Sequence, residues 1–342
     1  MLHKILAHLA LSRPEAELLK ASGGVARTVR DMTLDPRFQF IEAQARKRAV
    51  DWGSLTPERL RAQNEAMQAI FGGGAVSGVR TEQIYIPGRS HSVPARLYLP
   101  HVRDNAVAAL VYYHFGGGVI GSLQSCHRLC ALIARDAGAP VISVDYRLAP
   151  EHKFPAGLED ALAAYHWTLD HAARYGARAG KAAVGGDSMG GNFAAIVAQE
   201  VRMVRAPALQ LLIYPGLDFV NDAPSMHDFA DTFPLTAQTI EFFLKHYLPE
   251  GVDPSSARLS PGRTQDLSGL APALIYAAGF DMLLDQGQAY AQRLSEAGVG
   301  VEYCCFENLP HGFVAFPALA PAAEHALRRI ARETAAALKV RG

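Results

Sequence analysis

Ser188 lies at the centre of the segment "GDSMG" (residues 186–190), with a glycine at each end. The apolar run before the segment predicts a strand, and the apolar stripe after it, from Phe193 to Val204, predicts a helix. A G-x-S-x-G segment at such a turn places the serine oxygen at a helix N-terminus, which favours developing negative charge. Ser188 is therefore our candidate nucleophile, and the alternative is a turn of small residues without a chemical role.

A serine hydroxyl attacks poorly without a base, so a histidine and an orienting carboxylate must lie elsewhere in the chain. After this type of turn the expected order is serine, acid, histidine. His311, one of thirteen histidines, occupies "NLPHGF" between the last predicted strand and the last predicted helix. Asp281 directly follows the apolar run "APALIYAAG". We predict His311 as the base and Asp281 as the acid. Asp285 is the second choice for the acid, because we expect it inside the following helix.

The glycine-rich segment "HFGGGVIG" (residues 114–121) admits two interpretations. Its backbone N–H groups, with that of Met189 after the nucleophile, are suited to hold an oxyanion, because glycines allow close approach. Taken literally, the same letters match G-x-G-x-x-G, which binds a dinucleotide pyrophosphate, and Asp145 follows the next apolar run, where a ribose-binding acid would lie. The dinucleotide interpretation leaves the candidate nucleophile, acid and base without a role, so we prefer the oxyanion.

The composition points to a small-molecule ligand. Lys plus Arg and Asp plus Glu both total 33, so the formal net charge is zero, whereas proteins that bind nucleic acid or anionic membranes usually carry a basic excess. The fractions of hydrophobic residues, 49%, and charged residues, 19%, are typical of a globular protein. No apolar run reaches the roughly 18 to 20 residues of a membrane span, so we expect none.

The cysteines and the N-terminus predict a cytoplasmic protein. Cys126, Cys130, Cys304 and Cys305 show neither a disulfide framework nor C-x-x-C spacing, and we expect free thiols rather than a metal site. The first residues predict an amphipathic helix that ends near Pro14, in preference to a signal peptide.

The order of predicted elements indicates how these residues are positioned. Residues 1–75 contain helical patterns, and "TEQIYIPG" and "VPARLYLP" then alternate as in a hairpin at a sheet edge. Near-continuous apolar runs follow, separated by predicted helices and typical of a sheet covered on both faces. The predicted helices cover residues 122–138, 157–176, 188–205, 282–297 and 320–338. This alternation predicts a doubly wound α/β sheet, with residues 1–75 and the aromatic insertion 216–250 outside it.

Several segments in order resemble the bacterial hormone-sensitive-lipase-like (family IV) esterases of the α/β-hydrolase superfamily. The resemblance covers residues 105–315 and rests on "YYHFGGGVIGS", "VDYRLAPEHKFPA", "GGDSMGGN", "IYPGLD", "GFDMLLDQGQAYAQRLSEAG" and "PHGFVAF". It implies an α/β-hydrolase fold with a catalytic domain over residues 76–342 and a helical cap formed by 1–75 and 216–250. The roles that it implies are Ser188 as nucleophile, Asp281 as acid, His311 as base, and Gly116, Gly117 and Met189 as oxyanion donors.

The chain departs from the pattern of this family at two points. Members usually have H-G-G-G followed by an aromatic residue, whereas here Phe115 and Gly118 are exchanged, so Gly117 and Gly118 are the alternative pair of donors. The missing bulk at position 118 is expected to reshape the pocket wall. Met189 stands where alanine is common, which leaves its N–H unaffected. In "DYRLAPE" we expect Asp145, Arg147 and Glu151 to form a buried structural network rather than to catalyse.

The resemblance implies a serine carboxylesterase that cleaves short- to medium-chain esters and needs neither a metal nor an organic cofactor. An amidase or peptidase with the same triad is the first alternative, because the triad does not distinguish the two. A non-catalytic small-molecule receptor on this fold is less consistent with the presence of all three candidate residues. The expected partner is an ester substrate, and a homodimer is left open.

Overall fold

A computed structural model of the chain describes residues 9–48 and 50–341. At its centre is an eight-stranded sheet with the strand order β10-β9-β8-β7-β5-β6-β4-β3. β3 pairs antiparallel with β4 and β4 with β6, while the other neighbours are parallel. The strands are β3 (Val79–Pro87), β4 (Ser92–Pro100), β5 (Ala109–Tyr113), β6 (Val141–Val144), β7 (Ala182–Asp187), β8 (Gln210–Ile213), β9 (Ala273–Phe280) and β10 (Val301–Pro310). The predicted mostly parallel sheet with an edge hairpin is confirmed.

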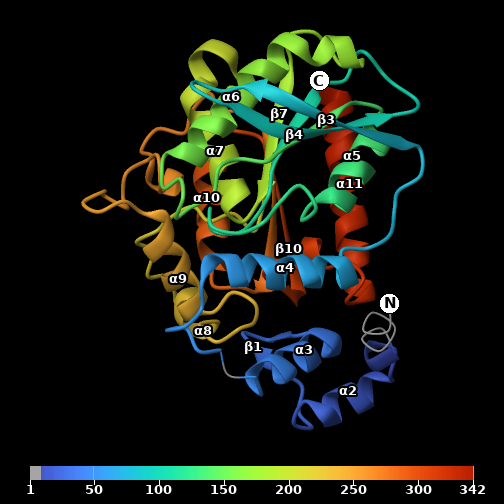
Figure 1. Cartoon of the computed structure of the whole chain (residues 1–342), viewed down its shortest axis with the longest axis vertical. Helices are drawn as coiled ribbons and strands as arrows, with labels where there is room; N and C mark the ends of the chain where they lie inside the picture. The colour runs from blue at the N-terminus through green and yellow to red at the C-terminus, as the bar shows by residue number, and fades with distance from the viewer. Residues whose placement is uncertain (1–8, 49, 342) are drawn as a thin grey trace.

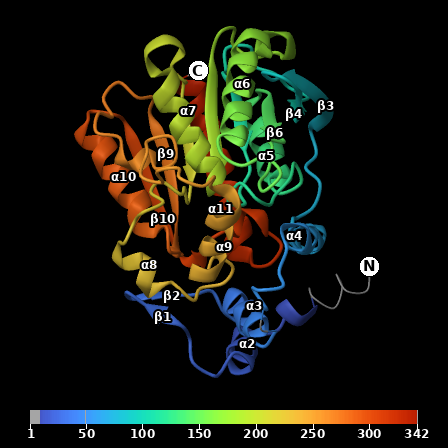
Figure 2. The same ribbon diagram turned by 60° about the vertical axis from the view of Figure 1, so that its left-hand side comes forward.

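Helices cover both faces of this sheet (Figures 1 and 2). The five long helices that follow its strands are α5 (His127–Ala137), α6 (Ala156–His171), α7 (Met189–Arg205), α10 (Leu284–Glu296) and α11 (Pro321–Arg341). Short 3-10 turns add η1 (Ala172–Tyr175), η2 (Pro261–Arg263) and η3 (Phe313–Ala315). One core packs the sheet against α6, α7 and α10, and the other packs it against α5 and α11.

Strand β5 shows why the sequence contains continuous apolar runs. Val111 contributes to the core on one face, and its neighbours Leu110 and Tyr112 contribute to the core on the other, because successive side chains of a strand point to opposite faces. Every residue of β5 is buried. A strand covered on both sides must be apolar at every position, as predicted.

The C-terminal ends of the parallel strands bring the candidate residues together. Ser188 follows β7, Asp281 follows β9 and His311 follows β10, while the glycine-rich segment follows β5. Since parallel strands end at the same edge of a sheet, residues far apart in the sequence meet there.

The N-terminal elements lie beyond this edge, beside the segment that follows β8 (Figures 1 and 2). They are α2 (Glu15–Ala21), β1 (Thr28–Val29), β2 (Met32–Thr33), α3 (Pro36–Arg46) and α4 (Pro57–Phe71), and the segment after β8 contains α8 (Pro224–Asp228) and α9 (Ala237–Tyr247). The two parts are joined by ion pairs of Arg27 with Asp231 and of Arg30 with Asp228, both at 2.6 Å. The predicted helix before Pro14 falls largely on residues outside the described ranges.

Helix α4 begins with a capped first turn and then contacts the glycine-rich segment. The side chain of Thr56 accepts a hydrogen bond from the Arg59 N–H, and Pro57 occupies the first turn, where its missing N–H costs nothing. Further along α4, Arg61 donates to the backbone carbonyls of Val119 and Ala149, both at 2.8 Å. The N-terminal part is therefore tied directly to the loop after β5.

The prediction of one buried network in "DYRLAPE" is wrong. Arg147 pairs with Asp160 on α6 at 2.9 Å, where Asp160 is almost fully buried. Glu151 is exposed and instead binds Arg61. Asp145 is half-buried, and its N–H donates to Pro94 on the neighbouring strand. Arg147 points toward the helix that follows the loop, whereas Glu151 lies in the turn itself and reaches outward to α4.

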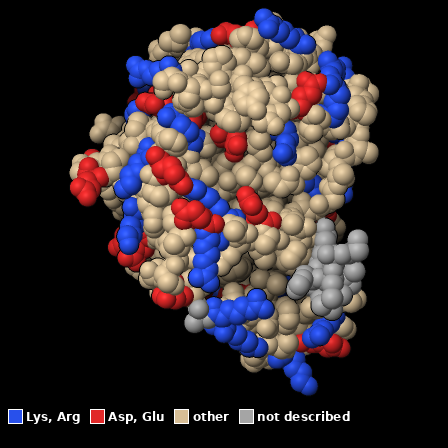
Figure 3. All heavy atoms as spheres, viewed as in Figure 1, with Lys and Arg blue, Asp and Glu red and all other residues tan. Residues whose placement is uncertain are grey.

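The surface seen in Figure 3 carries basic and acidic side chains interspersed, consistent with the zero net charge. The four cysteines are free, and Cys126 and Cys130 are buried. Among the described residues, none of the helices has the length and apolar character that crossing a bilayer requires.

Candidate active site

Ser188 occupies a strained turn between β7 and α7. Its φ of 56° and ψ of −116° are unusual for a residue with a side chain, and such strain persists where the surroundings hold it in place. A Cβ at Gly186 would overlap the backbone of Gly190, and a Cβ at Gly190 would overlap the carbonyl of Tyr113. The glycines of the motif are therefore required for close backbone packing.

The structure brings Ser188, His311 and Asp281 into one chain of hydrogen bonds. His311 Nε2 lies 2.9 Å from Ser188 Oγ, and its Nδ1 lies 2.7 Å from Asp281 Oδ2. All three side chains are at least nine-tenths buried. Because the Asp281 carboxylate only accepts, Nδ1 carries the proton and donates it, and Nε2 is left to accept the serine hydroxyl.

The local backbone fixes the acid and the base in place. Asp281 Oδ1 accepts the N–H of Leu283 at 2.9 Å, so the carboxylate is oriented by its own turn. His311 follows β10 directly, and Gly312 with φ of 78° turns the chain away into η3. Asp285, the second choice for the acid, lies in the first turn of α10 and pairs with Arg30 at 2.7 Å.

The glycine-rich segment places Gly117 beside the serine. Gly117 and Met189 line the same pocket as Ser188, and within the described chain neither N–H donates to another protein group. Gly116 lies next to Gly117, and its carbonyl accepts the N–H groups of Val119 and Ile120. The dinucleotide interpretation requires a helix that begins at the loop, but α5 begins only at His127, six residues after Gly121.

The surroundings of Gly118 and Phe115 show how the structure accommodates the exchange of these two residues. Gly118 has a φ of 72°, and a Cβ there would lie 2.5 Å from Cδ2 of Tyr247 on α9. Phe115 is half-buried and packs against the core. The space next to Gly118 is occupied by an aromatic side chain of α9.

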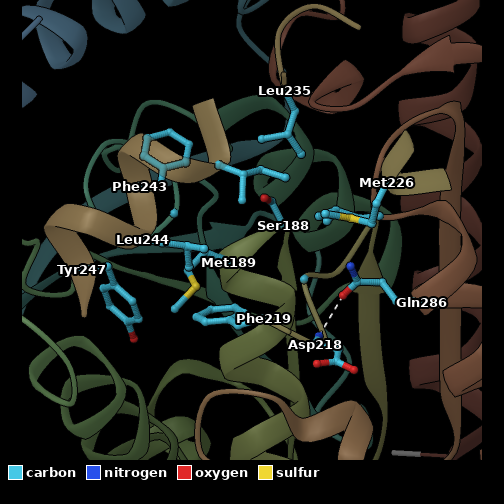
Figure 4. A pocket seen from close by; sticks show the side chains of 14 residues that line it. Ser188, Met189, Asp218, Phe219, Met226, Leu235, Phe243, Leu244, Tyr247 and Gln286 are labelled. Atoms are coloured by element: carbon cyan, nitrogen blue, oxygen red, sulfur yellow. Dashed lines mark hydrogen bonds between the residues drawn. The ribbon is translucent and has the colours of Figure 1, made fainter. Parts of the chain in front are cut away.

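The pocket in front of Ser188 is formed mainly by the segment after β8 (Figure 4). Its apolar wall includes Phe219, Met226, Leu235, Ile240, Phe243 and Leu244. Residues 9–48 and 50–75 contribute no lining residue. The polar side chains that line it besides Ser188 are Asp218, Gln286 and Tyr247. The pocket is thus largely apolar, with three polar side chains besides the serine.

The buried acid Asp187 lies behind the nucleophile. It accepts hydrogen bonds from the hydroxyls of Tyr112 at 3.0 Å and Tyr214 at 3.2 Å. Burial raises the pKa of Asp187 to about 7, while the two hydroxyls partly oppose this rise. The ring of Tyr214 packs on His311 with the ring centres 4.6 Å apart. Sequence reasoning missed this acid, because it occupies the variable second position of the G-x-S-x-G motif.

Comparisons with known proteins agree with this geometry. A family profile described as "alpha/beta hydrolase fold" matches residues 110–315. The carboxylic ester hydrolase LipN of Mycobacterium tuberculosis is 42% identical over 303 residues, which cover 86% of this chain and 80% of that protein. The chain belongs to the hormone-sensitive-lipase-like esterases of the α/β-hydrolase superfamily.

Further members of the superfamily are similar over most of their length. The ethyl acetate hydrolase of Pseudomonas putida is 37% identical over 307 residues, covering 86% of this chain and 96% of that protein. The hyperthermophilic esterase of the archaeon Pyrobaculum calidifontis superposes with a TM-score of 0.82 at 36% identity, covering 89% of this chain and 98% of that structure. The predicted fold, family and class of enzyme, a carboxylic ester hydrolase, are confirmed.

Proposed function

We propose that the protein cleaves carboxylic esters through an acyl-enzyme formed on Ser188. The supporting observation is the position of His311, within hydrogen-bond distance of both Ser188 and Asp281. His311 takes the hydroxyl proton as the serine oxygen attacks the ester carbonyl, and Asp281 stabilises the resulting imidazolium. His311 then returns the proton to the leaving alcohol. Water hydrolyses the acyl-enzyme by the same steps, again with His311 as the base.

The oxyanion is held by the N–H groups of Gly116, Gly117 and Met189. Gly117 and Met189 line the pocket beside Ser188 with uncommitted N–H groups, and Met189 begins α7, whose N-terminus favours negative charge. Gly116 is the neighbour of Gly117 in the same turn. Donors held in this way need no reorganisation when the charge develops.

The pocket supports a preference for short- to medium-chain esters. Its cavity has a volume of about 80 Å³. This is smaller than the apolar cavity of about 150 Å³ that is enough to hold benzene, so the cavity leaves little room for a long acyl chain. Residues 216–250 supply most of its wall and, with residues 1–75, form the cap over a catalytic domain of residues 76–342. Long acyl chains would have to displace this wall.

The test is the hydrolysis of p-nitrophenyl esters from acetate to laurate, with the p-nitroanilide of the best acyl group beside them. We expect kcat/KM to reach its maximum at a short or medium chain and to fall at laurate, with the anilide cleaved far more slowly. A wild-type protein that cleaves none of the esters would overturn the proposal. Faster cleavage of the anilide would favour the amidase alternative.

A further inference from the structure

The side-chain amide of Gln286 on α10 is hydrogen-bonded through its oxygen but not through its nitrogen. Its side chain is 6% exposed, and Oε1 accepts the backbone N–H groups of Leu217 at 2.5 Å and Asp218 at 2.8 Å. Both of these groups are donors, so the amide atom that faces them must be the oxygen. The NH₂ group must therefore point the other way.

The NH₂ group of Gln286 has no acceptor in the described protein. Nε2 is buried and without a hydrogen-bond partner, and Figure 4 shows it on the side of the amide turned toward Met226 and Ser188. A buried donor without a partner is costly, so such groups are rare unless a ligand or water satisfies them. The strongest acceptor among the side chains that line the pocket, the carboxylate of Asp218, makes no hydrogen bond with Nε2.

The rest of the pocket limits the kind of acceptor that fits. The carboxylate of Asp218 also lines the pocket and is held by Arg263 at 3.0 Å. The lining residues include no lysine, arginine or histidine. An anionic substrate group would thus meet a carboxylate and no cation, whereas an uncharged oxygen would meet a neutral donor.

We propose that Gln286 Nε2 donates a hydrogen bond to an uncharged oxygen in the part of the substrate that this pocket receives. The enzyme then favours esters with an ether, keto or hydroxyl oxygen, separated from the scissile carbonyl by at least one methylene, over hydrocarbon esters of the same length. This inference rests on the proposed esterase function and deepens it, because it names a specificity-determining residue and a class of substrate.

The test compares esters that differ only by an oxygen in place of a methylene. In the acyl series, p-nitrophenyl 3-methoxypropanoate is matched with the pentanoate, and the methoxyacetate with the butanoate. In the alcohol series, 2-methoxyethyl butanoate is matched with butyl butanoate. Each pair gives a ratio of kcat/KM values, measured for wild type and Gln286→Glu. Glutamate keeps the acceptor for Leu217 and Asp218 but removes the neutral donor.

We expect the ratio of ether ester to hydrocarbon ester to fall about tenfold in Gln286→Glu in at least one pair, the effect of losing one hydrogen bond in a buried site. Comparing ratios cancels the different intrinsic reactivity of the two esters. Met226→Leu, which alters the same pocket without touching a donor, should shift both members of each pair equally. Unchanged ratios in every pair would overturn the inference.

If Gln286→Glu does not fold, the test uses the wild-type enzyme alone. For each pair, the ratio of kcat/KM values is divided by the ratio of the spontaneous hydrolysis rates, which removes the difference in intrinsic reactivity between the two esters. A preference for an ether ester would support the inference, and a preference for the hydrocarbon ester in every pair would overturn it. If the wild-type enzyme cleaves the ether ester and the hydrocarbon ester of every pair equally well, this inference is disproved, but the proposed esterase function is not. One that cleaves no ester disproves the proposed function.

Discussion

A Cβ at Gly118 would lie 2.5 Å from Cδ2 of Tyr247, so the tyrosine ring fills the space that a side chain on the loop would take. Gly118 also has a φ of 72°, which disfavours any other residue. Two effects therefore favour glycine at position 118: the left-handed backbone conformation, and the overlap that a side chain would have with Tyr247. Mutation can separate the two effects, because only the overlap depends on a residue of α9.

Gly118→Ala should lower both stability and esterase activity, and the loss should shrink in a Tyr247→Ala background. The strain of the left-handed backbone, about 1 kcal/mol, remains in both backgrounds, while the overlap with the ring disappears. A double-mutant cycle on the free energy of unfolding should give a coupling of about 1–3 kcal/mol. A coupling near zero would show that Tyr247 does not restrict the loop.

Asp281→Asn should lower kcat by on the order of 10⁴-fold with little loss of stability, because an amide beside Nδ1 favours the wrong tautomer of His311. The matched control is Asp285→Asn, four residues further on. Asp285 binds Arg30 rather than the histidine, so kcat should stay within a few-fold of wild type. The measurement is kcat on one p-nitrophenyl ester. Equal losses in the two variants would contradict the assignment of the acid.

The strand ends explain which parts of the site could be predicted from the sequence. Ser188, Asp281 and His311 each follow a strand, and the predicted order of the strands was enough to place them at the same edge of the sheet. The partner of Arg147 was missed because Asp160 lies on the next helix, and nothing in "DYRLAPE" shows which way the arginine turns. The free donor of Gln286 was equally hidden, since it depends on which backbone groups its oxygen meets.

Asp187 should make the protein less stable as the pH rises. Burial raises its pKa from 3.8 to about 7, so between these values the folded state keeps a proton that the unfolded state loses. Stability from this group is thus complete below about pH 4 and falls, by about 4 kcal/mol in all, as the pH rises to about 7. The free energy of unfolding of Asp187→Asn, minus that of wild type, should therefore increase from pH 4 to pH 7 and then level off.

The control for the pH series is Asp253→Asn. Asp253 is exposed, and the hydroxyl of Ser255 lowers its pKa, so its difference from wild type should not increase across the same range. A flat difference for Asp187→Asn would mean that the carboxyl is ionised in the folded protein at pH 4.

The most direct test of the central claim is kcat for Ser188→Ala on the p-nitrophenyl ester that the wild type cleaves best. The variant should fold with a circular dichroism spectrum like that of wild type, because alanine only removes the hydroxyl. If Ser188 is the nucleophile, kcat falls by on the order of 10⁴ to 10⁶. A folded variant that retained wild-type turnover would contradict the acyl-enzyme mechanism and the role of His311 and Asp281 within it.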